Sequence, residues 1–102
     1  MSRISSSITI VCYDISSNKL RRKIDRCMKD FGVRLQFSIF LCRLDTVGIE
    51  RCRSKIEKLL KQFDKEKEAS DSVIIFERIN PDVARCLLGS RIDRQPPDFT
   101  IY

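Results

Sequence analysis

The sequence contains no histidine and no tryptophan, and it has only three glycines and three prolines. The absence of histidine removes the commonest metal ligand and general base, so any catalysis must use carboxylates, hydroxyls, cations or a metal ion. The scarcity of glycine and proline excludes a fibrous or low-complexity chain. With 42% hydrophobic and 33% charged residues, the 102 residues are typical of one globular domain with a modest core.

Long apolar runs are also missing, since none approaches the roughly 20 residues that a membrane-spanning helix needs. The first residues show neither a long apolar segment nor a small-residue cleavage site, so we expect no secretory signal. The five cysteines, at positions 12, 27, 42, 52 and 86, include no Cys-x-x-Cys pair. This pattern favours buried thiols in a reducing compartment over a disulfide framework or a zinc site. We therefore expect a cytoplasmic protein without a membrane partner.

The net charge of +6 is concentrated at one end of the chain. Residues 1–43 carry nine Lys and Arg against three Asp and Glu, whereas residues 44–102 carry eleven of each kind. Clustered cations are typical of a protein that binds a polyanion, usually nucleic acid. A basic surface kept for solubility explains the same composition.

Hydrophobic periodicity predicts alternating strands and helices. Residues 8–13 are apolar or β-branched at both parities, which is typical of a central strand covered on both faces. Residues 16–18 predict a turn and an N-cap, and helical spacing then continues to Phe31, with Gly32 expected as a left-handed C-cap. Residues 33–44 alternate in character, as one bent strand or two short ones.

The second half repeats this order. Asp45 and Thr46 predict the cap of a second helix, a solvated loop follows over residues 64–71, and residues 72–79 read as another strand. Beyond it we expect a turn or short helix and a polar tail that ends in a short strand within residues 90–102.

Two helices on one face of a small, mainly antiparallel sheet form an α+β sandwich, and the ferredoxin-like βαββαβ plan fits best. We expect a single domain over residues 1–102 with its core at about 8–79. Such a sheet leaves its second face bare, and we expect Phe40, Ile74 and Phe76 on it. A contiguous apolar patch of that kind predicts a homodimer.

Asp14 ends the first strand immediately before a basic helix. A lone Asp in this place is commonly a cap for the following turn. The functional alternative is a metal-binding carboxylate. Since Mg²⁺ usually takes one or two carboxylates together with phosphate oxygens and water, two copies of Asp14 facing each other across a dimer axis would form a site.

The first helix presents a cationic face with few compensating acids. Such a face is usually only solvated, but its start close to Asp14 favours contact with a phosphodiester backbone. The cations of this helix are Arg21, Arg22, Lys23, Arg26 and Lys29.

Next along the chain, Arg34, Gln36 and Ser38 share a strand face that is either solvent-facing or a polar rim around the metal. Phe40 could stack on a base, but we favour a dimer interface for it.

Three segments, in this order, resemble the CRISPR-associated protein two family, the small subunit of the CRISPR adaptation machinery. They are the strand end Tyr13-Asp14-Ile15-Ser16, the helix segment Arg21-Arg22-Lys23-Ile24, and the run Phe31-Gly32-Val33-Arg34-Leu35-Gln36-Phe37-Ser38-Ile39-Phe40. The resemblance extends from about Ile8 to Phe76.

The resemblance implies a ferredoxin-like homodimer that acts as a metal-dependent endonuclease on RNA or duplex DNA. It implies that Asp14, one from each protomer, is the metal-binding and catalytic carboxylate, with Mg²⁺ or Mn²⁺ as cofactor. The expected nucleic-acid-binding residues are Arg21, Arg22, Lys23, Arg26 and Arg34, and the expected supporting residues are Tyr13, Ser38 and Phe40.

The resemblance also implies a protein partner. The C-terminal strand, residues 99–102, is expected to join the sheet of the partner protomer and to help contact the CRISPR integrase. One alternative function is a non-catalytic adaptor that bridges integrase dimers and holds duplex DNA on its basic face. Another is a related ferredoxin-like ribonuclease toxin, which shares the start of strand, Asp and helix.

Overall fold

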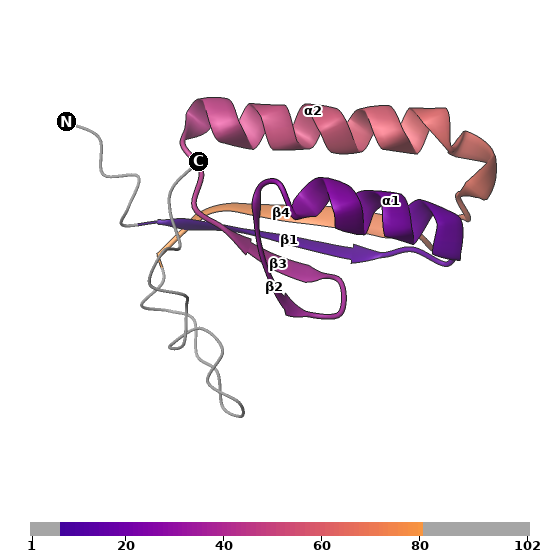
Figure 1. The fold of residues 1–102 in the computed structure, drawn as a ribbon, viewed down its shortest axis with the longest axis horizontal. Helices are drawn as coiled ribbons and strands as arrows, with labels where there is room; N and C mark the ends of the chain where they lie inside the picture. Colours follow the sequence, from indigo (N-terminus) through magenta and orange to yellow (C-terminus); the bar gives the residue numbers. More distant parts are fainter. Residues whose placement is uncertain (1–6, 81–102) are drawn as a thin grey trace.

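A computed structural model describes residues 7–80, in which two helices pack on one face of a four-stranded sheet (Figure 1). The elements are β1 (Ile8–Asp14), α1 (Asn18–Met28), β2 (Gly32–Gln36), β3 (Ile39–Cys42), α2 (Thr46–Gln62) and β4 (Ser72–Ile79). The strands are antiparallel and lie in the order β2-β3-β1-β4. This confirms the predicted ferredoxin-like plan. The turn, tail and C-terminal strand expected beyond Asn80 lie outside the described residues.

Both helices begin at the caps that the sequence predicts. The Ser17 hydroxyl accepts a hydrogen bond from the Leu20 amide at 3.2 Å, and the Asp45 carboxylate accepts one from the Gly48 amide at 2.7 Å. Each bond satisfies an amide that has no partner within the first helical turn. The apolar stripe of each helix then faces the sheet, with Leu20, Ile24 and Met28 buried on α1 and Ile49, Cys52 and Ile56 buried on α2.

The core lies between these stripes and the upper face of the sheet. Val11 and Tyr13 of β1 and Phe40 and Cys42 of β3 are all buried there. Val73 and Ile75 of β4 pack against the same cluster from the edge of the sheet. The strands therefore present alternate residues to the helices, as the pleat of a strand requires.

The segment of residues 33–44 forms two strands, and Arg34 and Phe40 lie on the face that meets the helices, contrary to the prediction, while Gln36 is exposed as expected. A turn at Phe37 and Ser38 separates β2 from β3. Phe40 is fully buried beneath the helices instead of lying on the bare face, so its prediction as an interface residue is wrong. Its cross-strand partner Arg34 lies on the same face, with the guanidinium carbon 5.0 Å from the ring centroid. A cation on an aromatic ring explains why a polar side chain is tolerated there.

The prediction for Gly32 is also wrong. Helix α1 ends at Met28, and its C-cap Lys29 keeps a right-handed helical conformation, so Gly32 is no left-handed cap. It begins β2, where a Cβ atom would lie 2.2 Å from the carbonyl oxygen of Leu41 on β3. A residue without a side chain is needed because the two backbones approach closely.

The segment of residues 64–71, predicted as a loop, contains a short 3-10 helix at Asp64–Glu66.

The lower face of the sheet is apolar. The register pairs Ile10 with Leu41 and Phe76, and Cys12 with Ile39 and Ile74, so all of these share one face. Ile74 and Phe76 remain 48% and 46% exposed. Within residues 7–80, both helices lie on the opposite face (Figure 1). The prediction of a bare apolar face is therefore confirmed for Ile74 and Phe76.

The four described cysteines are free thiols, while Cys86 lies outside the described residues. Burial raises the pKa of Cys42 and of Cys52 to about 12, so both stay protonated at neutral pH. Such thiols behave as small apolar core residues. No helix in the described part of the chain has the length and apolar character to cross a bilayer.

Candidate functional site

Asp14 is the last residue of β1 and lies opposite Ser72 of β4. Its side chain is exposed, and the strand alternation places it with Ile10 and Cys12 on the face turned away from the helices. Within residues 7–80, no three His, Cys, Asp or Glu side chains are grouped so that they could hold a metal ion. One chain therefore offers a carboxylate at an open sheet face, and an ion bound there needs further oxygen ligands from elsewhere.

The connection from β1 to α1, directly after Asp14, is fastened to the segment that leads into β4. The amide and the hydroxyl of Ser16 both donate to Asp71 at 3.0 Å, and the Ser17 hydroxyl donates to Glu66 at 2.8 Å. The backbone amides of Glu68 and Ser16, which donate to Asp71, hold its pKa below the usual range for a carboxyl. The end of β1 is thus held by charge-assisted hydrogen bonds across the sheet.

Arg21 acts in the same connection. Its guanidinium donates to the backbone oxygen of Ile15 at 3.0 Å and also to the side-chain oxygen of Asn18. Ile15 directly follows Asp14, so Arg21 bridges the first turn of α1 and the end of β1. Its described contacts therefore hold the loop between β1 and α1 together, and its predicted binding of nucleic acid stays a prediction.

Tyr13 and Arg34 meet on a shared carboxylate, that of Asp25. The Tyr13 hydroxyl donates to Asp25, and an Arg34 nitrogen lies 3.4 Å from the other Asp25 oxygen. The Tyr13 ring stacks on Phe40 with centroids 6.3 Å apart, and its amide donates to the Ser38 carbonyl at 3.1 Å. Tyr13 and Phe40 are therefore brought together with Arg34 on the side of the sheet opposite to Asp14, while Ser38 contacts Tyr13 through its backbone carbonyl.

This cluster holds neighbouring elements in position. Burial, together with the hydrogen bond to Asp25, raises the pKa of the Tyr13 phenol far above its usual value, so the phenol stays neutral and donates its hydrogen bond. Arg34 also donates to the carbonyl of Phe37 in the turn of the hairpin. The cluster ties the β2–β3 hairpin and helix α1 to the end of β1, and so fixes where Asp14 lies.

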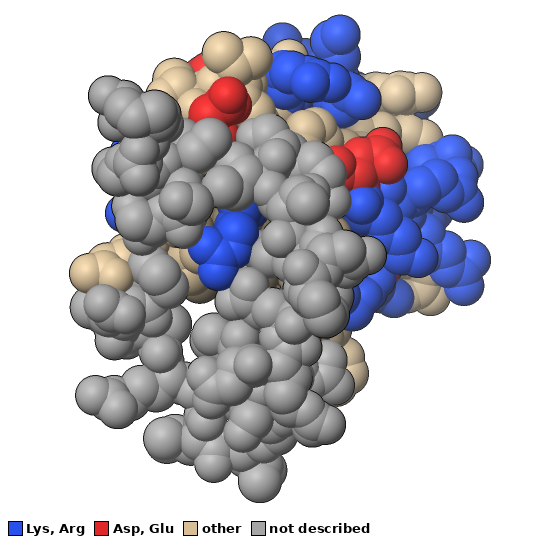
Figure 2. All heavy atoms as spheres, turned by 60° about the vertical axis from the view of Figure 1, so that its left-hand side comes forward, with Lys and Arg blue, Asp and Glu red and all other residues tan. Residues whose placement is uncertain are grey.

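The other cations lie along α1. Arg22 and Arg26 are exposed, and the half-buried Lys23 places its ammonium 5.8 Å from the centroid of the Phe63 ring. Lysine and arginine side chains gather along one side of the molecule in Figure 2. A surface of this kind attracts phosphates electrostatically, at any sequence.

Sequence reasoning missed Asp25 and Asp71. Asp25 falls four residues after Arg21 on α1, where it reads as an ordinary helix acid that offsets the basic face. Asp71 closes a polar loop and has no pattern of its own. Only their long-range partners, Tyr13 for one and Ser16 for the other, show that they position the end of β1.

Comparison with known proteins identifies the family to which the chain belongs. A family model described as CRISPR associated protein Cas2 matches residues 7–84. A CRISPR-associated endoribonuclease Cas2 from Geobacter sulfurreducens is 32% identical over 80 residues, which cover 74% of this chain and 78% of the relative. A second CRISPR-associated endoribonuclease Cas2, from Synechocystis, is 30% identical over 92 residues, or 90% of this chain and 95% of the relative.

The fold agrees as well. The crystal structure of Streptococcus pyogenes Cas2 at pH 6.5 matches with a TM-score of 0.56 at 20% identity, over 68% of this chain and 82% of that one. The family match spans every described strand and helix, from β1 with Asp14 to β4. The resemblance of the Tyr13-Asp14 strand end and the β2–β3 segment is thereby confirmed, and the chain belongs to the CRISPR associated protein Cas2 family.

Proposed function

We propose that this protein is a metal-dependent endonuclease of CRISPR adaptation that acts on RNA or duplex DNA as a homodimer. The observation that carries the proposal is the place of Asp14, an exposed carboxylate at the end of a strand whose neighbouring apolar face is open. Two curated relatives are named CRISPR-associated endoribonucleases, which supports phosphodiester cleavage as the reaction.

The apolar sheet face supports the dimer. Ile74 and Phe76 are half exposed there, on a strand that pairs with β1. Apolar surface of this kind is buried when a second copy packs on it, and a two-fold axis brings the same residue of each copy together. With Asp14 near this axis, each copy contributes one carboxylate to a common site.

Different residues of this chain have separate roles in the proposed reaction. Asp14 from each copy would hold Mg²⁺ or Mn²⁺, whose chemistry is to polarise the phosphodiester and lower the pKa of a bound water. Arg22, Lys23 and Arg26 bind phosphates along α1 and orient the backbone. Tyr13 and Arg34, through Asp25, hold the strand end that carries Asp14 in place from the opposite side of the sheet. With no histidine in the chain, a protein base of the usual kind is absent.

Cleavage by the Asp14→Asn variant tests the proposal. Wild type is expected to cleave single-stranded RNA or duplex DNA with Mg²⁺ and to stop with chelator, and Asp14→Asn is expected to be inactive. Glu77→Gln is the matched control, because Glu77 is an exposed carboxylate at the other end of β4, and it should keep wild-type activity. Equal activity in wild type and Asp14→Asn would show that Asp14 has no catalytic part.

A second function is supported by one observation, that Arg22 and Arg26 on α1 are exposed cations, which can bind phosphates whether or not Asp14 holds a metal ion. The dimer would then be an adaptor that binds duplex DNA on its basic residues and bridges copies of the CRISPR integrase, with Asp14 idle. This function predicts that neither wild type nor Asp14→Asn cleaves, and that both bind duplex DNA equally.

A further inference from the structure

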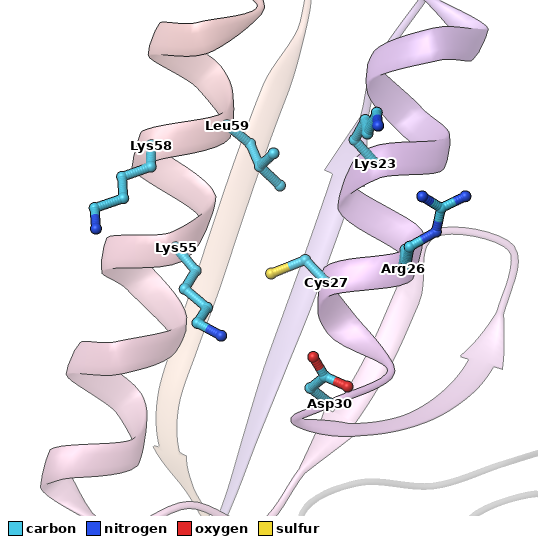
Figure 3. A pocket seen from close by; sticks show the side chains of 7 residues that line it. All are labelled: Lys23, Arg26, Cys27, Asp30, Lys55, Lys58 and Leu59. Carbon is cyan, nitrogen blue, oxygen red and sulfur yellow. The ribbon is translucent and has the colours of Figure 1, made fainter.

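A groove with a volume of about 430 Å³ runs between α1 and α2 on the outer surface of the helical layer. Figure 3 shows Cys27 of α1 and Leu59 of α2 pointing into the space between the two helices, while the Lys55 side chain reaches from α2 towards α1. Cys27 and Leu59 pack against the core below, so the floor of the groove is apolar. The groove is lined by Lys23, Arg26, Cys27, Asp30, Lys55, Lys58 and Leu59.

The rims of the groove are cationic on both sides. Helix α1 contributes Lys23 and Arg26, and helix α2 contributes Lys55 and Lys58. Each pair is spaced three residues apart, or about 4.5 Å along the helix axis, so the two pairs form parallel cationic rims. Asp30 is the single acid among the lining residues.

The positive charges of these four side chains are available to a ligand. Within residues 7–80, none of them forms an ion pair with a carboxylate. By contrast, Arg53 on the same helix α2 is paired with both Glu50 and Glu57. Of the two α2 lysines, Lys55 reaches towards α1 and Lys58 points to the outer side of α2 (Figure 3), and within residues 7–80 neither has a carboxylate partner, although that helix also carries acids.

Two of the lysines are also held in place by aromatic rings. The Lys23 ammonium lies 5.8 Å from the centroid of Phe63, and the Lys55 ammonium lies 5.8 Å from that of Phe31. A ring face attracts an ammonium without neutralising it, and it restricts the many conformations of a lysine side chain. Both helices thus present partly ordered positive charges to the groove.

We propose that this groove binds a phosphodiester backbone, so that Lys55 and Lys58 of α2 extend the nucleic-acid surface of α1 across the helical layer. The inference rests on the proposed function for the α1 cations, since Lys23 and Arg26 belong to both surfaces. A phosphodiester chain fits because it carries a regular series of negative charges that can contact cations on both rims. An acidic protein segment would instead need apolar side chains for the floor.

Binding of a fluorescein-labelled duplex DNA and of a labelled single-stranded RNA, measured by anisotropy over a series of salt concentrations, tests the groove. All titrations contain chelator, so that cleavage cannot change the probe. The test variant is Lys55→Ala/Lys58→Ala, and Lys61→Ala/Lys65→Ala is the control with the same loss of charge outside the groove lining. Arg22→Ala reports on the α1 surface independently. Alanine favours helix, and Lys55→Gln/Lys58→Gln serves if the alanine variant fails to fold.

We expect Lys55→Ala/Lys58→Ala to weaken binding and to reduce the slope of log affinity against log salt by about two, one for each lysine that no longer neutralises a phosphate. A reduced slope with the duplex alone, the RNA alone or both supports the groove and identifies the nucleic acid. A wild-type slope in both arms, while Arg22→Ala reduces it, overturns the groove and leaves the proposed function standing. No change in any variant overturns both the groove and the proposed phosphate binding by α1, and an equal reduction in the control overturns the groove in favour of diffuse attraction.

Discussion

Tyr13 and Asp14 are neighbours in β1 whose side chains face opposite sides of the sheet. Tyr13 is buried beneath the helices and bonded to Asp25, whereas Asp14 is exposed on the open face. The strand alternation therefore separates a positioning residue from the candidate catalytic one. A change at Tyr13 should act on stability first, and a change at Asp14 on chemistry alone.

Tyr13→Phe is expected to lower the free energy of unfolding by about 1.5–3 kcal/mol, because the hydrogen bond that it removes is to a charged acceptor. The pKa of Tyr13 is raised in the fold, so this stabilisation is complete below the unfolded pKa of about 10 and is lost as the pH rises above it. Urea unfolding at neutral and at alkaline pH measures the difference. If wild type and Tyr13→Phe lose stability in parallel across alkaline pH, the phenol is not held as described.

Single residues also show which structural roles can be predicted from the sequence and which cannot. The place of Asp14 follows from a strand pattern that stops at an acid, and it was predicted correctly at the end of β1. Gly32 was recognised as special for the wrong reason, since the nearness of the Leu41 carbonyl depends on the pairing of β2 with β3. Asp25 and Asp71 could not be predicted because their partners lie far away in the sequence.

At the scale of elements, the helices were predicted more reliably than the hairpin. Caps at Ser17 and Asp45 are local signals, and the helical period of α1 and α2 marks one apolar stripe. The segment of residues 33–44 has apolar residues on both faces, so alternation separates the two faces without telling which one meets the helices. The face that meets the helices is determined by the contacts of Arg34 with Asp25 and Phe40. Asp25 lies on α1 and Phe40 on β3, so the alternation within β2 alone does not reveal these contacts.

Charge reversal on α1, Arg22→Glu/Arg26→Glu, is expected to weaken duplex binding and to flatten its salt dependence. The two exposed guanidiniums are proposed to contact phosphates, and a helix without them displaces fewer counterions from the DNA when it binds. Filter binding over a salt titration measures both effects, with Lys61→Glu/Lys65→Glu as the control of equal charge. Unchanged affinity at every salt concentration would remove α1 from the nucleic-acid surface.

At the scale of the molecule, the sheet has one face covered by helices and one apolar face that the described elements leave open (Figure 1). We expect wild type to be a dimer in light scattering at micromolar concentration. Phe76→Asp should shift it to the monomer, because a charge buried at an apolar interface is costly. The exposed Lys65→Asp serves as control and should remain dimeric. A wild-type monomer, or a dimeric Phe76→Asp variant, would exclude this face as the interface.

Two copies of Asp14 are proposed to share one divalent ion, and calorimetric titration of the dimer with Mn²⁺ counts the ions bound. We expect one ion for every two chains in wild type, and no binding at that site in Asp14→Asn. One ion for each chain, or the same binding in Asp14→Asn, would exclude a shared site.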